Sequence, residues 1–287
     1  MIVYTDLYNR TKNYTLTYKM INKVENQCDV EINTTVNPNA EIYWGDKITP
    51  HHLKLMPNIK WVHLSKTGVD VEIDKSIKIT NTPESSNGVA EYATAAVLHL
   101  LRGLDRITTN RLEFDKNINY IKPFNKVTCL VVGMGQIGKE VARLLSLLGM
   151  KVEGVPRHMH INEFKKLPYD FIINALPKTS KTINYFTSKT FSKMKKSSYI
   201  INVGRGETIN EIDLYNALKS KQIRGAFLDV IQNEPMQSTN QLLELDNIFI
   251  SPHIANALEN SLDTQVKAFT DNLVKYQNKQ SLNNIIK

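Results

Sequence analysis

The chain has 287 residues, of which 41% are hydrophobic and 22% are charged, within the ordinary range of folded globular proteins. This length is enough for two medium-sized domains with separate cores. No stretch approaches the ~18 consecutive apolar residues of a membrane span, and the first residues lack the basic and then apolar order of a signal peptide. The two cysteines, Cys28 and Cys129, are far apart in the sequence and indicate no disulfide framework. We therefore expect a cytoplasmic protein in which Cys129 is a buried free thiol.

The formal net charge of +8 makes nucleic-acid binding one function class to consider. The lysines are scattered, however, and the densest group, at residues 193–196, has no flanking aromatic side chains. We therefore expect no nucleic-acid partner and no membrane partner. A positive surface that attracts anionic small molecules is compatible with the charge, as is a plain solvated surface.

The first part of the chain is predicted to form a small α/β domain in which strands alternate with weakly helical connectors. The predicted strands lie at residues 41–45, 58–64 and 77–80. Trp44 is close to the end of the first of these strands, where it either lines a ligand cleft or packs in the core. Residues 81–88 are rich in turn formers, which predicts the crossing to a second domain.

Two further helices define the predicted domain limits. Residues 89–102 are rich in alanine and leucine and predict a helix, on which His99 is expected to pack rather than to catalyse. From about residue 257 an amphipathic pattern predicts one helix that ends near Lys279 and returns to the first domain. The predicted domains are a substrate domain at 1–87 completed by 258–287, and a dinucleotide-binding domain at 88–257.

The second domain is organised around a strand, a glycine turn and a helix. Apolar patterns predict the strand at residues 126–132 and the helix at 139–148. Between them Gly133, Gly135 and Gly138 have the G-x-G-x-x-G spacing, which suits a tight turn, a close approach to pyrophosphate and close helix packing. Free N–H groups at the start of the helix would bind the phosphates. This order of elements predicts a dinucleotide-binding site.

Strands and helices continue to alternate after this turn. A helix is predicted at 212–218, and strands are predicted at 151–155, 170–177, 198–204, 225–230 and 248–253. Such alternation builds a parallel, doubly wound sheet. Ligands of these sheets bind at the carboxyl ends of the strands, where Gly204, Asp229 and Ser251 are expected.

Three polar segments follow predicted strands and are expected at that edge: residues 202–206, 228–235 and 251–255. Their side chains suit the chemistry of a 2-oxo acid, which presents a carboxylate and a ketone. Arg205 offers a planar fork of donors for a carboxylate or a developing alkoxide. His253 can donate a proton to the ketone oxygen and take it back in the reverse reaction. Glu234 would orient the imidazole ring.

These segments resemble the D-isomer-specific 2-hydroxyacid dehydrogenases, and most closely their glyoxylate and hydroxypyruvate reductase branch. That family has its catalytic arginine in a G-R-G, its glutamate in an E-P after D-V, and its histidine in a P-H-x-A. Here these are Arg205, Glu234 and His253, in the same order. Residues 61–70 resemble the family's substrate loop, and residues 89–93 resemble its interdomain helix. The resemblance implies a Rossmann domain with a smaller flavodoxin-like α/β substrate domain.

The resemblance also implies which residues bind ligands. Thr67, Gly68 and Val69 match the backbone amides that hold the substrate carboxylate together with Arg205. Lys66 stands where a small residue is usual, so it either adds a charge to the pocket or points into solvent, and Thr67 replaces alanine or serine. No metal site is implied. The implied cofactor contacts are Gly133, Gly135, Gln136, Ile137, Gly138, Arg157, His158, Leu176, Pro177, Val203, Gly204, Asp229, His253 and Asn256.

The choice of nicotinamide cofactor depends on the end of the strand at 151–155. An NAD site usually has Asp or Glu there to bind the ribose hydroxyls. Pro156 occupies that position, Arg157 and His158 follow, and Glu153 lies earlier in the strand. Arginine pairs with a 2′-phosphate, which a carboxylate would repel. The sequence therefore predicts NADP(H) as the preferred cofactor; alternatively, Arg157 stacks on adenine and NAD(H) is accepted too.

The leading hypothesis is a reductase of small 2-oxo acids, with glyoxylate and hydroxypyruvate as the first substrates to test. Two alternatives remain open at this point. One is a cofactor-gated binding protein, since some relatives act as transcriptional corepressors. The other is a dehydrogenase of another small acid, such as formate or phosphite. The resemblance also implies a homodimer formed through the cofactor domain.

Overall fold

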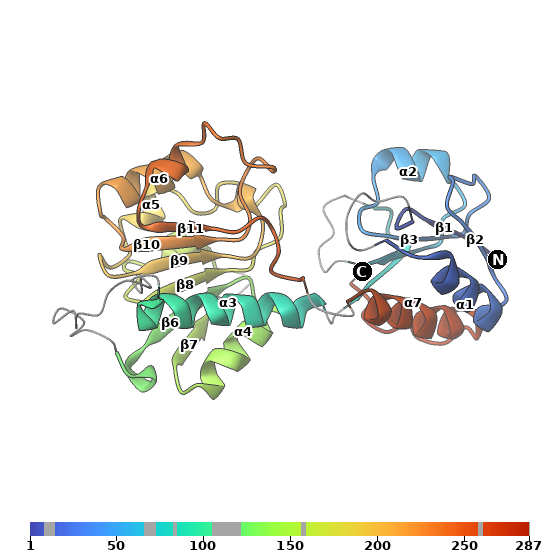
Figure 1. Ribbon diagram of the computed structural model, residues 1–287, viewed down its shortest axis with the longest axis horizontal. Coiled ribbons are helices and arrows are strands. Elements are labelled where there is room, and N and C mark those ends of the chain that lie inside the picture. The colour runs from blue at the N-terminus through green and yellow to red at the C-terminus, as the bar shows by residue number, and fades with distance from the viewer. Residues whose placement is uncertain are drawn as a thin grey trace, which may run out of the picture. The chain divides into compact units, whose positions relative to one another are not determined.

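The computed structural model describes residues 1–8, 15–65, 73–82, 85–104, 122–155, 159–257 and 261–286. These residues form two compact units, drawn in Figure 1: Met1–Ser85 with Ala257–Lys287, and Ser86–Asn256. The limits predicted from the sequence differ from these by one or two residues at each boundary. In the described segments, no helix combines the length and the hydropathy that are needed to cross a membrane.

The first unit contains a five-stranded sheet in the order β2-β1-β3-β4-β5, in which every neighbouring pair is parallel. This is the strand order of flavodoxin-like folds, and it confirms the predicted α/β class of the unit. The elements are β1 (Ile2–Thr5), α1 (Tyr18–Cys28), β2 (Glu31–Asn33), β3 (Ile42–Gly45), α2 (Pro50–Leu55), β4 (Trp61–Leu64), β5 (Lys78–Asn81) and α7 (Ser261–Gln277).

Helix α7 belongs to the first unit although it follows the second along the chain. Its apolar face supplies Phe269, which is fully buried in the core with Leu273. The Phe269 ring stacks on Trp44, with 4.1 Å between the ring centroids. Trp44 is itself 0% exposed. Of the two roles open for Trp44, the structure therefore supports packing in the core.

Helix α1 and strands β1 and β2 were not predicted individually. Thr17 caps α1 by accepting a hydrogen bond from the Met20 N–H at 3.3 Å. Ile21, Val24 and Cys28 are its buried side chains, at a spacing that places them on one face. The apolar side chains are few and the strands are short, so the sequence pattern for these elements is weak.

The second unit contains a six-stranded sheet in the order β11-β10-β9-β8-β6-β7, again with every neighbouring pair parallel. Its strands are β6 (Thr128–Val132), β7 (Lys151–Gly154), β8 (Phe171–Asn174), β9 (Tyr199–Asn202), β10 (Gly225–Leu228) and β11 (Ile248–Ile250). Its α-helices are α3 (Ser85–Arg102), α4 (Gln136–Leu147), α5 (Ser188–Phe191) and α6 (Glu211–Lys219). Short 3-10 helices are η2 (Phe124–Lys126), η3 (Ile161–Glu163), η4 (Gly206–Thr208) and η5 (Gln241–Glu244).

Alternate side chains of these strands enter two cores, one on each face of the sheet. In β6, Leu130 packs with the cluster that includes α6, whereas Cys129 and Val131 pack with the cluster that includes α3 and α4. The two cores confirm the predicted doubly wound sheet, whose strands and helices are labelled in Figure 1. Cys129 is a buried free thiol, as predicted, and burial together with the charge of Asp170 raises its pKa to about 12. His99 packs edge-on against Phe249.

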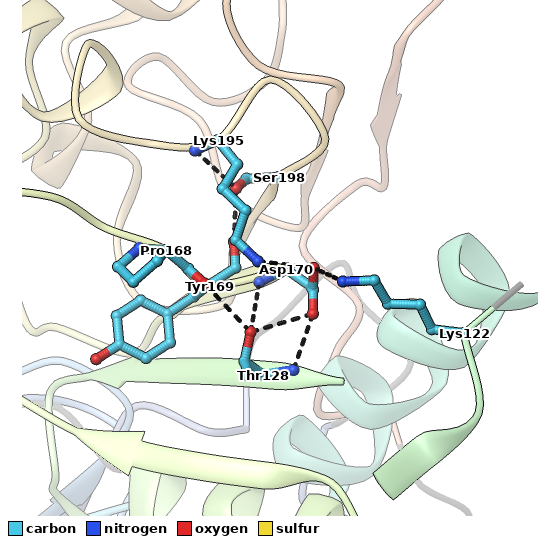
Figure 2. A network of polar contacts seen from close by, with 7 residues as sticks. All are labelled: Lys122, Thr128, Pro168, Tyr169, Asp170, Lys195 and Ser198. Atoms are coloured by element: carbon cyan, nitrogen blue, oxygen red, sulfur yellow. Dashed lines mark hydrogen bonds and ion pairs between the residues drawn. The ribbon is translucent and has the colours of Figure 1, made fainter. Parts of the chain in front are cut away.

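The amino-terminal edge of this sheet is held by the charge network around Asp170, shown in Figure 2. Its carboxylate accepts hydrogen bonds from Lys122 Nζ at 2.6 Å, Lys195 Nζ at 3.0 Å and the Thr128 N–H at 3.0 Å. Burial alone would raise the pKa of Asp170, but these donors outweigh burial and hold the pKa below its usual value. The network connects the starts of β6, β8 and the turn before β9.

Candidate active site

The three polar segments converge at the carboxyl edge of the second sheet. Strands β9, β10 and β11 are parallel neighbours, and Leu228 pairs with both Asn202 and Ile250. Arg205, Glu234 and His253 each lie in the segment that follows one of these strands. The structure thus brings together the three segments that the sequence predicted to meet.

The glycine turn after β6 forms an open backbone cradle. Gly133 has a φ of +98°, and a Cβ there would lie 2.8 Å from the Ala175 carbonyl oxygen, so only glycine fits. Around Gly135, in contrast, no atom lies within 4 Å of the position that a Cβ would take. Helix α4 begins at Gln136, directly after this opening. The cradle also lies between β6 and β8, where the strand order reverses, and it therefore fits a dinucleotide pyrophosphate.

The structure describes some of the other predicted cofactor contacts, and the rest lie outside the described residues. Gly138 is buried within α4, and Val203 is 4% exposed, with its side chain in the core. Leu176 and Asn256 are half-buried. The described part of the β7 segment ends at Val155. Pro156, Arg157 and His158 are outside the described residues, as are Lys66, Thr67, Gly68 and Val69.

The carboxylate of Glu153 in β7 is engaged within the protein. Its Oε2 accepts a hydrogen bond from the Tyr169 hydroxyl at 2.6 Å. Burial, together with this bond, raises the pKa of Tyr169 to about 12, so the hydroxyl stays a donor. Glu153 is therefore hydrogen-bonded within the protein through one of its two carboxylate oxygens.

Arg205 sits on a tight turn whose glycines pack against neighbouring backbone. A Cβ on Gly204 would lie 2.5 Å from the Leu176 carbonyl oxygen, and a Cβ on Gly206 would overlap the Ile231 carbonyl group. The Arg205 guanidinium donates to the Gly204 carbonyl oxygen at 2.9 Å. The G-R-G turn is therefore wedged between the loops that follow β8 and β10.

His253 and Glu234 form a hydrogen-bonded pair, with 2.8 Å between His253 Nδ1 and Glu234 Oε2. Their side chains are 41% and 37% exposed. The backbone of His253 has a φ of +56°, in the left-handed region that non-glycine residues rarely adopt. Such strain persists only where surrounding contacts hold it, and it is common at functional sites.

Asp229 supplies those contacts. Its carboxylate, 2% exposed, accepts hydrogen bonds from the Ser251 hydroxyl at 2.8 Å, the Ile254 N–H at 2.9 Å and the Ala255 N–H at 3.0 Å. Its backbone carbonyl accepts from the His253 N–H at 3.0 Å. The sequence predicts a cofactor contact for Asp229; in the structure both carboxylate oxygens hold the loop that carries His253. This positioning role was missed, although the position of Asp229 at the end of a strand was the signal for it.

Comparison with known proteins decides the family. Residues 94–255, more than half of the chain, match the family model of the D-isomer specific 2-hydroxyacid dehydrogenase, NAD binding domain. The chain belongs to this family. It is accordingly an enzyme of the NAD(P)-dependent 2-hydroxyacid dehydrogenase class, which transfers hydride between a nicotinamide cofactor and 2-hydroxy or 2-oxo acids.

Individual relatives agree with this assignment. The dehydrogenase is 33% identical over 232 residues to a D-3-phosphoglycerate dehydrogenase of Methanocaldococcus jannaschii, which covers 73% of this chain but only 44% of that protein. It is 29% identical over 261 residues to a glyoxylate reductase of Thermofilum pendens, covering 80% and 75% of the two chains. A solved D-lactate dehydrogenase from Aquifex aeolicus, complexed with NAD and lactic acid, has a TM-score of 0.78 at 26% identity and covers 100% and 99%.

Proposed function

We propose that this dehydrogenase is a D-specific reductase of small 2-oxo acids that prefers NADPH, with glyoxylate and hydroxypyruvate as the first substrates. The observation that carries the proposal is the His253–Glu234 pair, 2.8 Å apart, at the same sheet edge as the Arg205 turn and the open cradle at Gly135. An acid, a group that orients it and a carboxylate-binding fork are what reduction of a 2-oxo acid requires.

His253 is proposed as the proton donor to the ketone oxygen. Glu234 engages Nδ1, which leaves Nε2 as the ring nitrogen for the substrate. The ring is 41% exposed and is therefore accessible to a ligand. Glu234 keeps the ring in one orientation through its contact with Nδ1. In the reverse direction the same nitrogen takes the proton from the hydroxyl group.

Arg205 is proposed to bind the substrate carboxylate and the oxygen on which negative charge develops. Its guanidinium offers two parallel donors to a planar anion, which a lysine does not. The family resemblance implies that the backbone amides of Thr67, Gly68 and Val69 bind the same carboxylate. When bound, the nicotinamide cofactor supplies the hydride. Gly133, Gly135 and the first N–H groups of α4 would hold its pyrophosphate.

The preference for NADP(H) is the finer part of the proposal. Glu153, the acidic side chain in β7, is hydrogen-bonded to Tyr169, and the residues that follow it to the end of the described segment, Gly154 and Val155, carry no carboxylate. Pro156 stands where an acidic residue would bind the ribose hydroxyls, and Arg157 suits a 2′-phosphate. NAD(H) remains the weaker alternative cofactor.

We also infer a cytoplasmic enzyme that works as a homodimer through its cofactor-binding unit. The absence of a disulfide framework supports the reducing compartment. The dimer is implied by the family resemblance. Size-exclusion chromatography with light scattering measures the oligomeric state directly.

The substrate proposal is tested by following NADPH and NADH absorbance with a panel of 2-oxo acids. We expect turnover with glyoxylate or hydroxypyruvate and none with formate or phosphite in the oxidative direction. If no acid is reduced although fluorescence shows that the cofactor binds, the cofactor-gated binding protein is the better explanation. Reduction of only larger 2-oxo acids would reject glyoxylate and hydroxypyruvate but keep the enzyme class.

The cofactor proposal is tested by a charge reversal. A charge-assisted bond to the 2′-phosphate contributes about 1.5–3 kcal/mol, so we expect kcat/KM with NADPH to exceed that with NADH by at least about tenfold. Pro156→Asp combined with Arg157→Ala is expected to reverse the preference, because it adds a ribose acceptor and removes the phosphate partner. Equal kcat/KM values for the two cofactors in the wild type would reject the role of Arg157.

A further inference from the structure

Two buried asparagines lie side by side at the carboxyl ends of β8 and β9. Asn174 and Asn202 are partners in the strand register, and their exposed fractions are 0% and 1%. Asparagine is rarely buried so completely, and a buried amide must be hydrogen-bonded to be tolerated. This buried pair lies directly before the Arg205 turn, so its hydrogen bonds can influence that turn.

The side-chain amide of Asn174 makes three hydrogen bonds. Its Oδ1 accepts from the Leu176 N–H at 3.0 Å. Its Nδ2 donates to Asn202 Oδ1 at 2.8 Å and to Thr208 Oγ1 at 2.6 Å. A backbone N–H can only donate, so the bond from Leu176 determines which end of the Asn174 amide is oxygen.

The same logic orients Asn202 and Thr208. Asn202 Oδ1 also accepts from the Gly204 N–H at 3.1 Å, and its Nδ2 donates to the Arg205 carbonyl at 3.2 Å. Thr208 Oγ1 donates its single proton to the Arg205 carbonyl at 2.5 Å, so it accepts from Asn174. Two directed chains of hydrogen bonds therefore run from Asn174 to the backbone of Arg205.

We propose that Asn174 is a positioning residue for Arg205, acting through Asn202 and Thr208. Asn174 needs no contact with substrate or cofactor for this role. Through Leu176 it holds the loop after β8, and through Thr208 and Asn202 it holds the carbonyl of the residue whose side chain binds the oxo acid. The proposal rests on the role of Arg205 under the proposed function.

A purely structural role makes a different prediction. If the network only stabilises the core, its loss lowers Tm and leaves the kinetics of the folded fraction unchanged. If it positions Arg205, its loss raises KM for the oxo acid and lowers kcat, because the guanidinium leaves the productive geometry. The two roles are therefore separated by kinetics of the folded enzyme.

The main experiment compares Thr208→Val with Thr208→Ser. Valine keeps the shape of threonine but removes the hydroxyl bridge between Asn174 and Arg205, whereas serine keeps that bridge. Thr208→Val is expected to raise KM for the oxo acid by about tenfold or more, the effect of one lost hydrogen bond in the site. Thr208→Ser is expected to have a KM close to the wild-type value, because it keeps the hydroxyl bridge. The Kd of NADPH, measured by fluorescence, is expected to change little, because neither variant touches the Leu176 bond.

Asn174→Leu removes the side-chain amide from which both series of hydrogen bonds start. It releases the Leu176 loop as well as the Arg205 turn, so we expect a higher KM for the oxo acid and a weaker Kd for NADPH. If this variant does not fold, the comparison of Thr208→Val with Thr208→Ser still tests the proposal, because these substitutions are smaller. Wild-type KM and kcat in folded Thr208→Val would overturn the proposal.

A double-mutant cycle separates this proposal from the role of Arg205 itself. In an Arg205→Ala background the bridge has no guanidinium to position, so Thr208→Val is expected to change kcat/KM by less than about twofold. An equal fold-change in both backgrounds would show a general structural effect and overturn the positioning role. If Arg205→Ala alone has wild-type kinetics, the proposed function of Arg205 fails, whatever the Thr208 variants do.

Discussion

Two buried aspartates lie at opposite edges of the same sheet and restrain different parts of the protein. Asp170 starts the β8 region at the amino edge and is 7% exposed, and Asp229 follows β10 at the carboxyl edge and is 2% exposed. Asp170 is bound by two lysine ammonium groups and Thr128. The bonds to the Asp229 carboxylate come from a hydroxyl and two backbone N–H groups. Both carboxylates are hydrogen-bonded, but Asp170 is bonded to lysine side chains and Thr128, whereas Asp229 is bonded to the loop that carries His253.

The difference lies in what each carboxylate restrains. Asp170 connects strand starts to Lys122 and Lys195, whose side chains are partly exposed and carry no proposed chemistry. Asp229 restrains a backbone that already has a φ of +56° at His253. Breaking the first contact should therefore affect stability, and breaking the second should affect catalysis as well.

The largest effect is expected at the residue that Asp229 restrains. His253→Asn removes the proposed proton donor, and general acids of this kind contribute about 10²–10⁴ in rate. We expect kcat to fall by that factor while the Kd of NADPH, measured by fluorescence, stays close to wild type. A variant that keeps half of the wild-type turnover at neutral pH would remove His253 from the mechanism.

Arg205→Lys tests the other side chain proposed at the carboxyl edge. Lysine keeps the charge but lacks the bidentate fork. Losing one charge-assisted bond costs about 1.5–3 kcal/mol, so we expect kcat/KM for the oxo acid to fall by about tenfold to a hundredfold. Both KM and kcat should change in steady-state assays. Kinetics equal to wild type would place the guanidinium outside the substrate site.

Asp229→Asn is expected to affect both catalysis and stability. The amide keeps one acceptor oxygen, so the N–H of either Ile254 or Ala255 loses its acceptor, whereas the Ser251 hydroxyl can accept from the new NH2 group. An unsatisfied buried donor costs about 1–3 kcal/mol. We expect a lower Tm together with a roughly tenfold lower kcat, since the His253 loop is released. A loss of Tm with unchanged kcat would mean that Asp229, like Asp170, only stabilises the fold.

Asp170→Asn is the matched control at the amino edge and should leave kcat and KM unchanged. We expect it to lower the free energy of unfolding by about 1–3 kcal/mol at neutral pH. The folded pKa of Asp170 lies below the usual carboxyl value, so the stabilisation is complete above about pH 4 and is lost as pH falls through the folded pKa. The Tm difference between variant and wild type should therefore shrink on acidification, as measured by circular dichroism. A change in kcat would contradict the division between the two edges.

Much of the second unit could be predicted from the sequence, because its signals are local. The strand, the glycine turn and the helix of the dinucleotide-binding motif lie within about twenty residues, so their sequence patterns can be recognised together. The G-R-G, E-P and P-H-x-A segments each follow an apolar strand, so their meeting at one edge follows from the parallel sheet. The first unit was harder, since α1 and the three- and four-residue strands β2 and β1 carry weak patterns.

The sequence by itself determined the family, the glycine cradle and the side chains proposed for catalysis, because each depends on residue types at short spacing. Only the tertiary structure decided the roles of Asp229, of Trp44 and of the Asn174–Asn202 pair. Asn174 and Asn202 are 28 residues apart and meet only through the register of β8 and β9. Trp44 meets Phe269 only because the last helix returns to the first unit. The physical reason is that these contacts join segments that are distant in the sequence, and a local pattern does not identify which residue of a distant segment becomes the partner.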